Sequence, residues 1–401
     1  MNQPLTTKHF TSPIWQSPFR PFYLMGAIYC PLLVLLWLAS HAGIIGAVSP
    51  NYSLSLWHGH EMVFGFFGAI VAGFTLTFLG SWAQTEEISG GRLALISALW
   101  LLGRLAFYFS TLLPEMLVML LDSSLYFVIA LMVTPRLWAA PNRIYLIALI
   151  IFCGIGFGNL LFHLGIMQGN LELAALGLRT GIYAIMIKFV VAGAFLTVVF
   201  TNNILPDQGV QEITFNPWIE GFAVLSLAFY ILSDLLSMNS TWCFVAAVLA
   251  CVVHSIRFAR WHTWRVKAYP IILIMHLAYL WLILSFALRA IHDFSGTIST
   301  QIWLHAFTAG AMGLMGISFM TRVVLRHTGR QLRANPIIVV CYTSIFIAAV
   351  MRLCAYLFGF NNPLMISSAV LWTIPFAVYF VLYGHMLWQP SLPKRQIPKQ
   401  G

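Results

Sequence analysis

The chain has 401 residues, of which 60% are hydrophobic and only 8% are charged, and its mean hydropathy is +0.86. Soluble domains carry about 25% charged residues, so this composition excludes a soluble protein and indicates an integral membrane protein. The apolar stretches are also longer than the alternating segments of about 10 residues that form membrane β-barrels. The sequence therefore predicts an all-α, polytopic membrane protein.

Twelve apolar stretches are long enough to cross a bilayer, which takes about 20 residues per helix. We expect them to form one transmembrane domain over residues 22–388, between an N-terminal segment 1–21 and a C-terminal tail 389–401. Pro114 and Pro141 mark the clearest boundaries between stretches. In chain order, the predicted spans are 22–45, 57–83, 92–113, 115–135, 142–166, 178–204, 217–236, 241–260, 269–291, 301–325, 335–359 and 364–388.

The net charge of +10 follows the pattern of a membrane topology. When the N-terminus is placed in the cytoplasm, the outer loops hold only Arg179 and Arg289. This asymmetry agrees with the positive-inside rule, so we expect both termini to be cytoplasmic and expect no nucleic-acid partner. The positive residues on the inner side are Lys8, Arg20, Arg92, Arg136, Arg143, Arg257, Arg260, Arg265, Lys267, Arg322, Arg326, Arg330, Arg333, Lys394, Arg395 and Lys399.

Three positive residues, Arg104, Lys188 and Arg352, lie deep inside predicted spans. Each costs about 2.5–3.5 kcal/mol to insert, so we expect them to face the bundle interior and to meet an anion or a carbonyl group. A buried anionic ligand such as a haem propionate would serve, and so would a structural ion pair. Glu61 is an acid in a histidine-bearing span and is a candidate for a proton path.

His58 and His60 open the second predicted span. Residues two apart on an α-helix point about 200° away from each other, so one straight helix does not easily present both to one metal. On an α-helical period, the face of His58 continues through the small residues Gly65 and Ala69. That face would leave room for a flat macrocycle or for a neighbouring helix, and we favour His58 as a haem ligand.

His305 opens the tenth span on the same predicted side of the membrane, and the small residues of 309–316 follow it. Two histidines on separate helices above a narrow groove would suit a haem. His276 and His327 lie towards the inner side and form a candidate second metal site. A lone histidine in a span, such as His163, is more often a hydrogen-bonded packing residue than a ligand.

Several short segments follow one another along the chain in a recognisable order. They are Ser17-Pro18-Phe19-Arg20-Pro21-Phe22, Trp57-His58-Gly59-His60-Glu61-Met62 with Gly73-Phe74, Leu102-Gly103-Arg104, His276-Leu277-Ala278-Tyr279, His305-Ala306-Phe307-Thr308-Ala309-Gly310-Ala311-Met312, and Thr321-Arg322 with His327-Thr328-Gly329-Arg330. Together these segments resemble the NnrS family of bacterial membrane proteins. The resemblance implies a twelve-helix protein of the bacterial inner membrane that contains haem and copper and is involved in tolerance of nitric oxide.

By this resemblance, Arg104 and Arg322 are the matching arginines, expected to contact a cofactor. There are departures from the family pattern. The segment 193–198 stands where a Gly-Gly-Arg-x-x-Pro run is expected, and Arg326 stands where a glycine is expected before His327. Lys188 lies close enough in the sequence to replace the missing arginine's charge. The metal-ligand candidates implied by the resemblance are His58, His60, His276, His305 and His327.

The leading hypothesis is a redox protein that binds or reduces nitric oxide in the membrane with electrons from quinol. His58 and His305 would hold a haem b, and copper would bind at His60 or at the group of His276 and His327. A non-enzymatic protein that binds nitric oxide or transfers electrons is the second hypothesis. A transporter of anions or other small molecules, suggested by the deep positive residues, is the third. The sequence does not decide between enzyme and non-enzyme.

Overall fold

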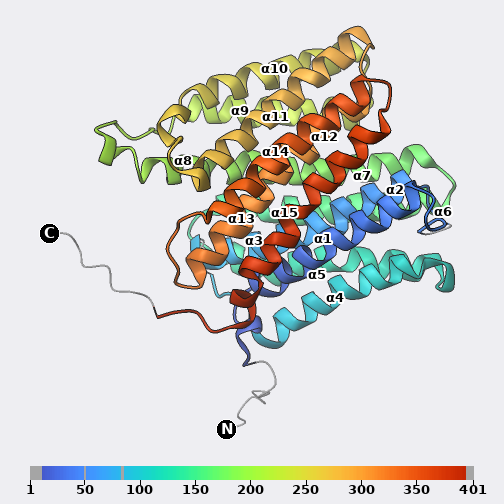
Figure 1. Ribbon diagram of the computed structural model, residues 1–401, viewed down its shortest axis with the longest axis horizontal. Coiled ribbons are helices and arrows are strands. Elements are labelled where there is room, and N and C mark those ends of the chain that lie inside the picture. Colours follow the sequence, from blue (N-terminus) through green and yellow to red (C-terminus); the bar gives the residue numbers. More distant parts are fainter. Residues whose placement is uncertain (1–10, 49–50, 83–84, 394–401) are drawn as a thin grey trace. The chain divides into compact units, whose positions relative to one another are not determined.

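The computed structural model describes residues 11–48, 51–82 and 85–393 (Figure 1). These residues form α, 3-10 and π helices and contain no strand, so the predicted all-α class is confirmed. The predicted terminal segments 1–21 and 389–401 lie partly outside the described residues. Four residues of the topology prediction, Lys8, Lys394, Arg395 and Lys399, also lie outside them.

Within the part of the chain that the structure describes, twelve helical stretches are long and apolar enough to cross a membrane, as predicted. The largest difference between a predicted and an observed span boundary is at the start of the sixth span, which begins at Leu171 and was predicted to begin at residue 178. Asn170 caps this helix, since its side-chain oxygen accepts a hydrogen bond from the Leu173 amide at 3.0 Å. The spans are Phe19–His41, Leu54–Ser81, Gly90–Tyr108, Glu115–Ala139, Arg143–Met167, Leu171–Asn202, Pro217–Leu235, Ser240–Ala259, Pro270–Ser295, Thr300–His327, Pro336–Leu357 and Asn362–Trp388.

The individual helices are labelled in Figure 1. The α-helices are α1 (Phe19–His41), α2 (Leu54–His60), α3 (Gly68–Trp82), α4 (Gly90–Tyr108), α5 (Glu115–Ala139), α6 (Ile147–Met167), α7 (Leu171–Lys188), α8 (Ala194–Asn202), α9 (Pro217–Leu235), α10 (Ser240–Ala259), α11 (Pro270–Ser295), α12 (Thr300–His305), α13 (Gly313–His327), α14 (Pro336–Leu357) and α15 (Asn362–Trp388). Three π-helices are η3 (Glu61–Phe67), η6 (Phe189–Gly193) and η9 (Ala306–Met312). Short 3-10 turns lie at Pro13–Trp15, Ser110–Leu112, Arg143–Leu146, Pro206–Gln208 and Thr263–Val266.

Local sequence signals set several helix ends. Asn216 precedes Pro217 at the start of α9, and its side chain accepts from the amides of Trp218 and Ile219. An asparagine at the cap satisfies amides that the helix itself leaves unpaired, and proline at the first position has no amide to satisfy. Gly329, two residues after the end of α13, has φ of 77°, and a glycine in this left-handed conformation is a common way to end a helix.

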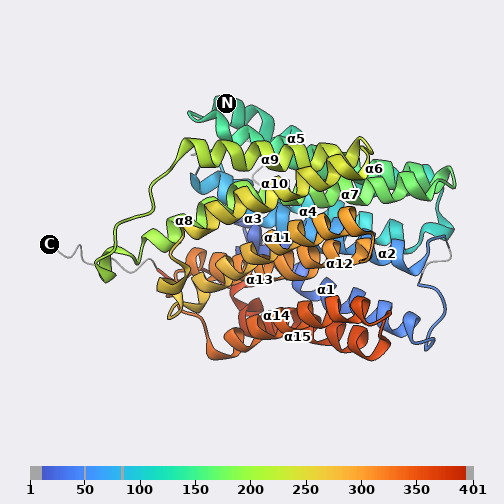
Figure 2. The ribbon, with the colours of Figure 1, turned by 90° about the horizontal axis from the view of Figure 1, so that it is seen from above.

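The chain divides into two compact units. The first unit extends to Leu178 and also includes Phe319–Arg333 and the chain from Phe376. Within it, α5 packs against α4 and α6, and α1 packs against α3. The second unit comprises Arg179–Ser318 and Ala334–Pro375. Within it, α10 packs against α9 and α11, as Figure 2 shows, and α11 packs against η9. That the spans form one domain stays a prediction.

Each of the three π-helices interrupts a span directly after an ionisable residue. The segment η3 follows His60, η6 follows Lys188, and η9 follows His305. The three interrupted spans are also the most enclosed of the twelve, with 89%, 71% and 78% of their apolar windows buried. Because π-helical turns in proteins occur frequently at functional sites, these three spans are the strongest candidates to carry functional residues.

The wider turn of a π-helix displaces backbone carbonyls from their usual partners, and side chains of neighbouring helices bind several of them. In the first unit, the Trp100 indole donates to the Gly65 carbonyl at 3.0 Å, and the Tyr126 hydroxyl donates to the Phe64 carbonyl. In the second unit, the Trp372 indole donates to the Ala309 carbonyl at 2.9 Å. An unsatisfied carbonyl at membrane depth costs several kcal/mol, so these donors stabilise the interruptions.

The segment η3 also corrects a prediction about the face of His58. That face was assigned with the period of an α-helix, which places Met62, Gly65, Ala69 and Ala72 in line with His58. A π-helix has i to i+5 hydrogen bonds, and η3 covers Glu61–Phe67. The assumed alignment is therefore wrong beyond His60, because the residues that follow are rotated relative to an α-helix.

The hydrogen bond from Trp100 to η3 gives a testable prediction. Replacing Trp100 with Phe keeps an aromatic ring but leaves the buried Gly65 carbonyl without its indole donor. We expect thermal unfolding of the detergent-purified protein to show a loss of about 1–3 kcal/mol. Trp218→Phe is the matched control, because Trp218 is 76% exposed. Equal melting temperatures for the two variants would contradict the assigned role of Trp100.

Candidate functional site

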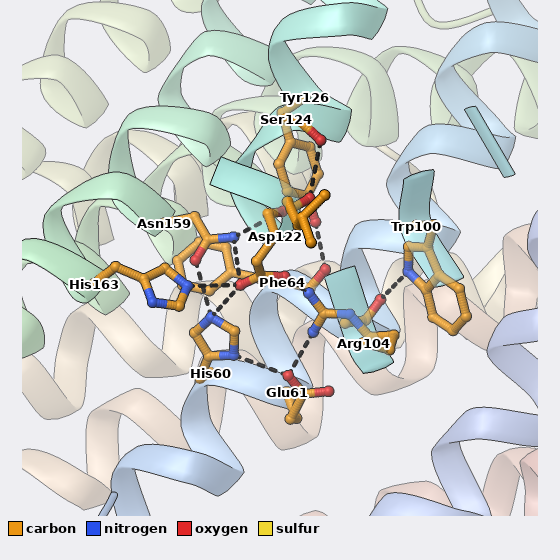
Figure 3. Close-up of polar contacts among 12 residues, drawn as sticks. His60, Glu61, Phe64, Trp100, Arg104, Asp122, Ser124, Tyr126, Asn159 and His163 are labelled. Atoms are coloured by element: carbon orange, nitrogen blue, oxygen red, sulfur yellow. Dashed lines mark hydrogen bonds and ion pairs between the residues drawn. The ribbon is translucent and has the colours of Figure 1, made fainter. Parts of the chain in front are cut away.

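The core of the candidate site is a buried ion-pair network on three helices of the first unit. The guanidinium of Arg104, on α4, lies between the carboxylates of Glu61, on η3, and Asp122, on α5 (Figure 3). Its Nη1 donates to Glu61 Oε1 at 2.5 Å, and its Nη2 donates to Asp122 Oδ1. The three side chains are 5% exposed or less. One arginine therefore binds together α4, α5 and the second span inside an apolar bundle.

His60 extends this network. Its Nδ1 lies 2.9 Å from Glu61 Oε1, and its Nε2 lies 2.9 Å from Asp122 Oδ2. The imidazole is fully buried and stacks on the Phe107 ring, with the ring centroids 3.9 Å apart and the planes 19° apart. Stacking and hydrogen bonding fix both the position and the plane of this histidine.

Helix α6 contributes two further side chains, His163 and Asn159. The Nε2 atom of His163 lies 2.9 Å from Asp122 Oδ2, the same oxygen that His60 approaches. The Asn159 amide donates to Asp122 Oδ2 at 3.0 Å, and its Oδ1 lies 2.9 Å from His60 Nε2. Figure 3 shows these side chains converging on Asp122. The atoms His60 Nε2, Asp122 Oδ2 and His163 Nε2 therefore meet around one buried point, and the three residues could hold a metal ion.

The cluster requires small and aromatic residues around it. A Cβ atom added to Gly65 would lie 2.9 Å from Arg104 Nη1 and 2.9 Å from the Tyr29 ring. Glycine at this position lets the guanidinium and the phenol approach η3. The Tyr29 hydroxyl donates to the second oxygen of Glu61, so both carboxylate oxygens of Glu61 have donors.

The cluster lies near one end of the helices that carry it. His60 is six residues after the start of α2 at Leu54, and His163 is four residues before the end of α6 at Met167. At a rise of about 1.5 Å per residue, these positions are roughly 6–9 Å from the helix ends. By the predicted topology this is the outer side of the membrane.

The charges of the cluster do not balance. Glu61 and Asp122 bring two negative charges, and Arg104 brings one positive charge. Both ring nitrogens of His60 face oxygen acceptors, namely Glu61 Oε1 on one side and Asp122 Oδ2 with Asn159 Oδ1 on the other. A neutral imidazole has only one N–H, so this geometry calls for one more positive charge at the cluster. Buried charges without compensation are strongly destabilising.

His305, at the end of α12, has the hydrogen bond typical of a metal-binding histidine. Its Nδ1 lies 2.8 Å from the Gln301 carbonyl. A carbonyl only accepts, so Nδ1 carries the proton and the lone pair is on Nε2. Metal-binding histidines usually donate their other N–H in this way. Its ring packs on Tyr356, with the ring centroids 5.2 Å apart.

His58 is half-buried, and its ring packs on Trp37 with the ring centroids 5.0 Å apart. His60 instead stacks on Phe107, so the two histidines have different ring neighbours. His58 belongs to the first unit and His305 to the second. Their convergence on one haem stays a prediction.

The predicted inner metal site also draws on both units, with His276 in the second and His327 in the first. Both ring nitrogens of His276 lie beside threonine hydroxyls, Thr201 Oγ1 at 2.9 Å and Thr263 Oγ1 at 3.0 Å. A metal at His276 would displace one of these hydroxyls. The ring of His327 packs on Phe19, with the ring centroids 5.6 Å apart. A metal role for these two histidines stays a prediction.

The deep positive residues are enclosed, as expected. Arg104, Lys188 and Arg352 are each about 6% exposed. The sequence left open whether Arg104 pairs with an anionic ligand or with protein carboxylates. In the structure its partners are protein carboxylates, so it forms a structural ion pair. Arg352 forms a side-chain hydrogen bond with Tyr356, and a cofactor role for the half-buried Arg322 stays a prediction.

Sequence reasoning missed Asp122 and Asn159 and treated His163 as a packing residue. Asp122 lies in an apolar span without any histidine, so no local motif marks it. The one available signal was its charge, because an aspartate at membrane depth is costly and usually functional or paired. The convergence of α5, α6 and η3 brings these residues together, and no sequence spacing indicates it.

The fold and this network define a multi-pass α-helical membrane protein with a buried cluster of histidines, acids and an arginine inside its spans. The family model described as NnrS protein matches residues 13–391, nearly the whole chain. The chain therefore belongs to the NnrS family, and the resemblance seen in its motifs is confirmed. Membership is consistent with a membrane protein related to nitric oxide. No curated protein matches the chain.

The ion-pair network gives a prediction about stability. Arg104→Met keeps a long side chain but leaves Glu61 and Asp122 without their shared cation. We expect a loss of about 3–5 kcal/mol, the penalty for removing one partner of a buried ion pair, measured by thermal unfolding in detergent.

Arg92→Met is the matched control on the same helix, since the Arg92 side chain is 63% exposed. A surface ion pair contributes about 0–1 kcal/mol, so the control should unfold close to the natural protein. If both variants unfold alike, the buried network does not carry the energy assigned to it.

Proposed function

We propose that this NnrS-family protein binds nitric oxide at a membrane-embedded haem b, with copper as a second metal, and protects the cell from nitrosative stress. The observation that carries the proposal is the side chain of His305. Its Nδ1–H bond to the Gln301 carbonyl leaves Nε2 as the nitrogen that would bind the iron of a haem. Family membership supports the connection with nitric oxide.

The surroundings of His305 fit an anionic cofactor. Tyr356 packs on the imidazole, and Arg352 lies one turn earlier on α14, hydrogen-bonded to the Tyr356 hydroxyl. Helix α14 packs directly against α12 and η9. An arginine buried at this depth is positioned to pair with a carboxylate, such as a haem propionate, because charge-assisted hydrogen bonds are strong in a low-dielectric environment.

The small residues near the histidines support packing and not an open groove. A Cβ atom at Gly310 would overlap the Trp281 ring. A Cβ atom at Gly313 would lie 2.6 Å from the Trp372 indole. Protein side chains therefore occupy the glycine face of η9, and the atom of His305 that would hold a haem is Nε2.

A bound haem would supply an iron centre that binds nitric oxide and exchanges electrons. The protein's own residues hold His305 in one tautomer, pack Tyr356 against its ring and supply Arg352 for charge balance. Glu61 keeps its predicted role in proton transfer as part of the proposal. Reduction would convert two nitric oxide molecules, two electrons and two protons into nitrous oxide and water, and quinol would supply the electrons and the protons.

Arg104 argues against the alternative of an anion transporter. Its guanidinium is already neutralised by Glu61 and Asp122. An anion on a path beside it would meet a cluster with excess negative charge. The two remaining hypotheses are binding of nitric oxide without turnover and catalytic reduction of nitric oxide. Both use the same haem, and formation of nitrous oxide distinguishes them.

The haem proposal predicts a Soret band in detergent-purified protein that shifts on reduction with dithionite and on addition of nitric oxide. His305→Ala removes the proposed axial ligand, so haem content measured by the pyridine haemochrome assay should fall to a small fraction of the natural level. His58→Ala should reduce it as well. The control is His385→Ala, a histidine in α15 outside the proposed site. Normal haem content in both ligand variants would sink the proposed pair.

Turnover gives a separate prediction. Purified protein supplied anaerobically with a quinol and nitric oxide should produce nitrous oxide, detected by gas chromatography, if the protein is a reductase. Glu61→Gln should then slow turnover while the haem spectrum stays unchanged. Tight nitric oxide binding with no nitrous oxide would assign the protein to the non-enzymatic class.

A further inference from the structure

We infer that His60, Asp122 and His163 form a binding site for a divalent first-row transition-metal ion, separate from the haem ligand His305. The inference rests on the proposed function in one respect, since it places the second metal of that proposal in the first unit. The experiment that tests the site does not depend on bound haem. Two of the three ligands, Asp122 and His163, have no part in the family motifs. The site is assigned from the convergence of their side chains.

The donor atoms have the arrangement that a metal site requires. His60 Nε2 and His163 Nε2 each lie 2.9 Å from Asp122 Oδ2, and the three residues offer ligand atoms within 4.8 Å of one another. Metal–ligand bonds of about 2.0–2.2 Å at a tetrahedral angle require neighbouring donors to be roughly 3.3–3.5 Å apart. Each imidazole nitrogen would need to move away from Asp122 Oδ2 by roughly half an ångström to reach that spacing.

The groups behind the ligands are arranged to orient them. Glu61 Oε1 lies 2.9 Å from His60 Nδ1, so a proton on Nδ1 bonded to that carboxylate directs the Nε2 lone pair towards Asp122. Arg104 occupies Asp122 Oδ1 and leaves Oδ2 facing both imidazoles. Carboxylate–histidine–metal triads of this kind fix the tautomer and raise the basicity of the ligand.

Charge favours a cation at this point. The two carboxylates outnumber Arg104, and each ring nitrogen of His60 faces oxygen acceptors. A metal at His60 Nε2 would satisfy that nitrogen, would neutralise the excess negative charge and would turn Asn159 Oδ1, at 2.9 Å, into an additional oxygen donor. Two imidazoles with one carboxylate form a donor set used by zinc, copper and iron sites.

The cluster lies close to one end of the helices that carry it. His60 and His163 lie roughly 6–9 Å from helix ends at the same end of their bundle, by the rise of about 1.5 Å per residue. An ion would therefore enter from one membrane surface and would not cross the whole apolar core.

Zn²⁺ is the probe for the experiment, because its X-ray absorption edge is separate from that of haem iron. Full-length protein in detergent is treated with a chelator, dialysed against Zn²⁺ and assayed for bound zinc by mass spectrometry. We expect one zinc per chain at the cluster. In its absorption fine structure, imidazole nitrogens and carboxylate oxygen should lie at about 2.0–2.2 Å.

His163→Gln removes one ligand while keeping a polar side chain. Mutation of a residue that only hydrogen-bonds to a metal ligand weakens metal affinity about 10–100-fold. Because His163 is itself a proposed ligand, we expect the zinc affinity of this variant to fall by at least that factor. The matched control is His254→Gln, a buried histidine of the second unit that is hydrogen-bonded to Tyr279, and it should keep the natural affinity.

Zinc affinity that is unchanged in His163→Gln, or no bound zinc in the natural protein, would overturn the inference. If His163→Gln does not fold, the X-ray absorption fine structure of zinc bound to the natural protein tests the inference instead. A spectrum without scattering from imidazole ligands would overturn it. The Soret band of the same sample reports on the haem proposal, so failure of the metal site and failure of the haem site are distinguishable.

Discussion

Burial of the Arg104 guanidinium between two carboxylates is the constraint on which the first unit depends. Removing three charged groups from water is expensive, and only close pairing with complete hydrogen bonding offsets that expense. Glu61 and Asp122 supply the pairing, while Tyr29, Asn159 and His60 bind the remaining oxygens. Helices that carry these residues are thereby fixed in register. A cluster of this kind contributes specificity in a bundle where apolar contacts alone have little directional preference.

The π-helical interruptions follow from the same need to place particular side chains inside the bundle. Directly after His60 and His305, the chain changes from α to π geometry, which turns the following residues relative to an α-helix. The cost in backbone hydrogen bonds is offset by Trp100 and Trp372, whose indoles donate to the displaced carbonyls. Both histidines are consequently held on the most enclosed spans, where an imidazole must have a defined partner. Function in this protein is expected where the backbone departs from regular α-helix.

Hydropathy and proline positions were sufficient to predict all twelve spans, because a bilayer demands long apolar helices. Motif resemblance identified the family and selected His60, His305, Glu61 and Arg104 as important residues. The sequence did not indicate Asp122 as their partner, since an isolated aspartate has no periodicity or spacing to mark it. It also could not indicate η3, because a π-helix needs no distinctive residues and disrupts the period on which faces are assigned. Local sequence patterns therefore predicted part of the site, including His60, Glu61 and Arg104. Tertiary packing adds Asp122, which no local pattern marks.

The measurement that tests this account most directly is a double-mutant cycle between Arg104 and Asp122. Unfolding free energies are compared for Arg104→Met, Asp122→Asn, the double variant and the natural protein. We expect the double variant to be far more stable than the sum of the two single losses implies, with a coupling energy of about 2–3 kcal/mol. Losses that add to within about 0.5 kcal/mol would show that the two side chains do not interact, and the buried network at the centre of this account would be contradicted.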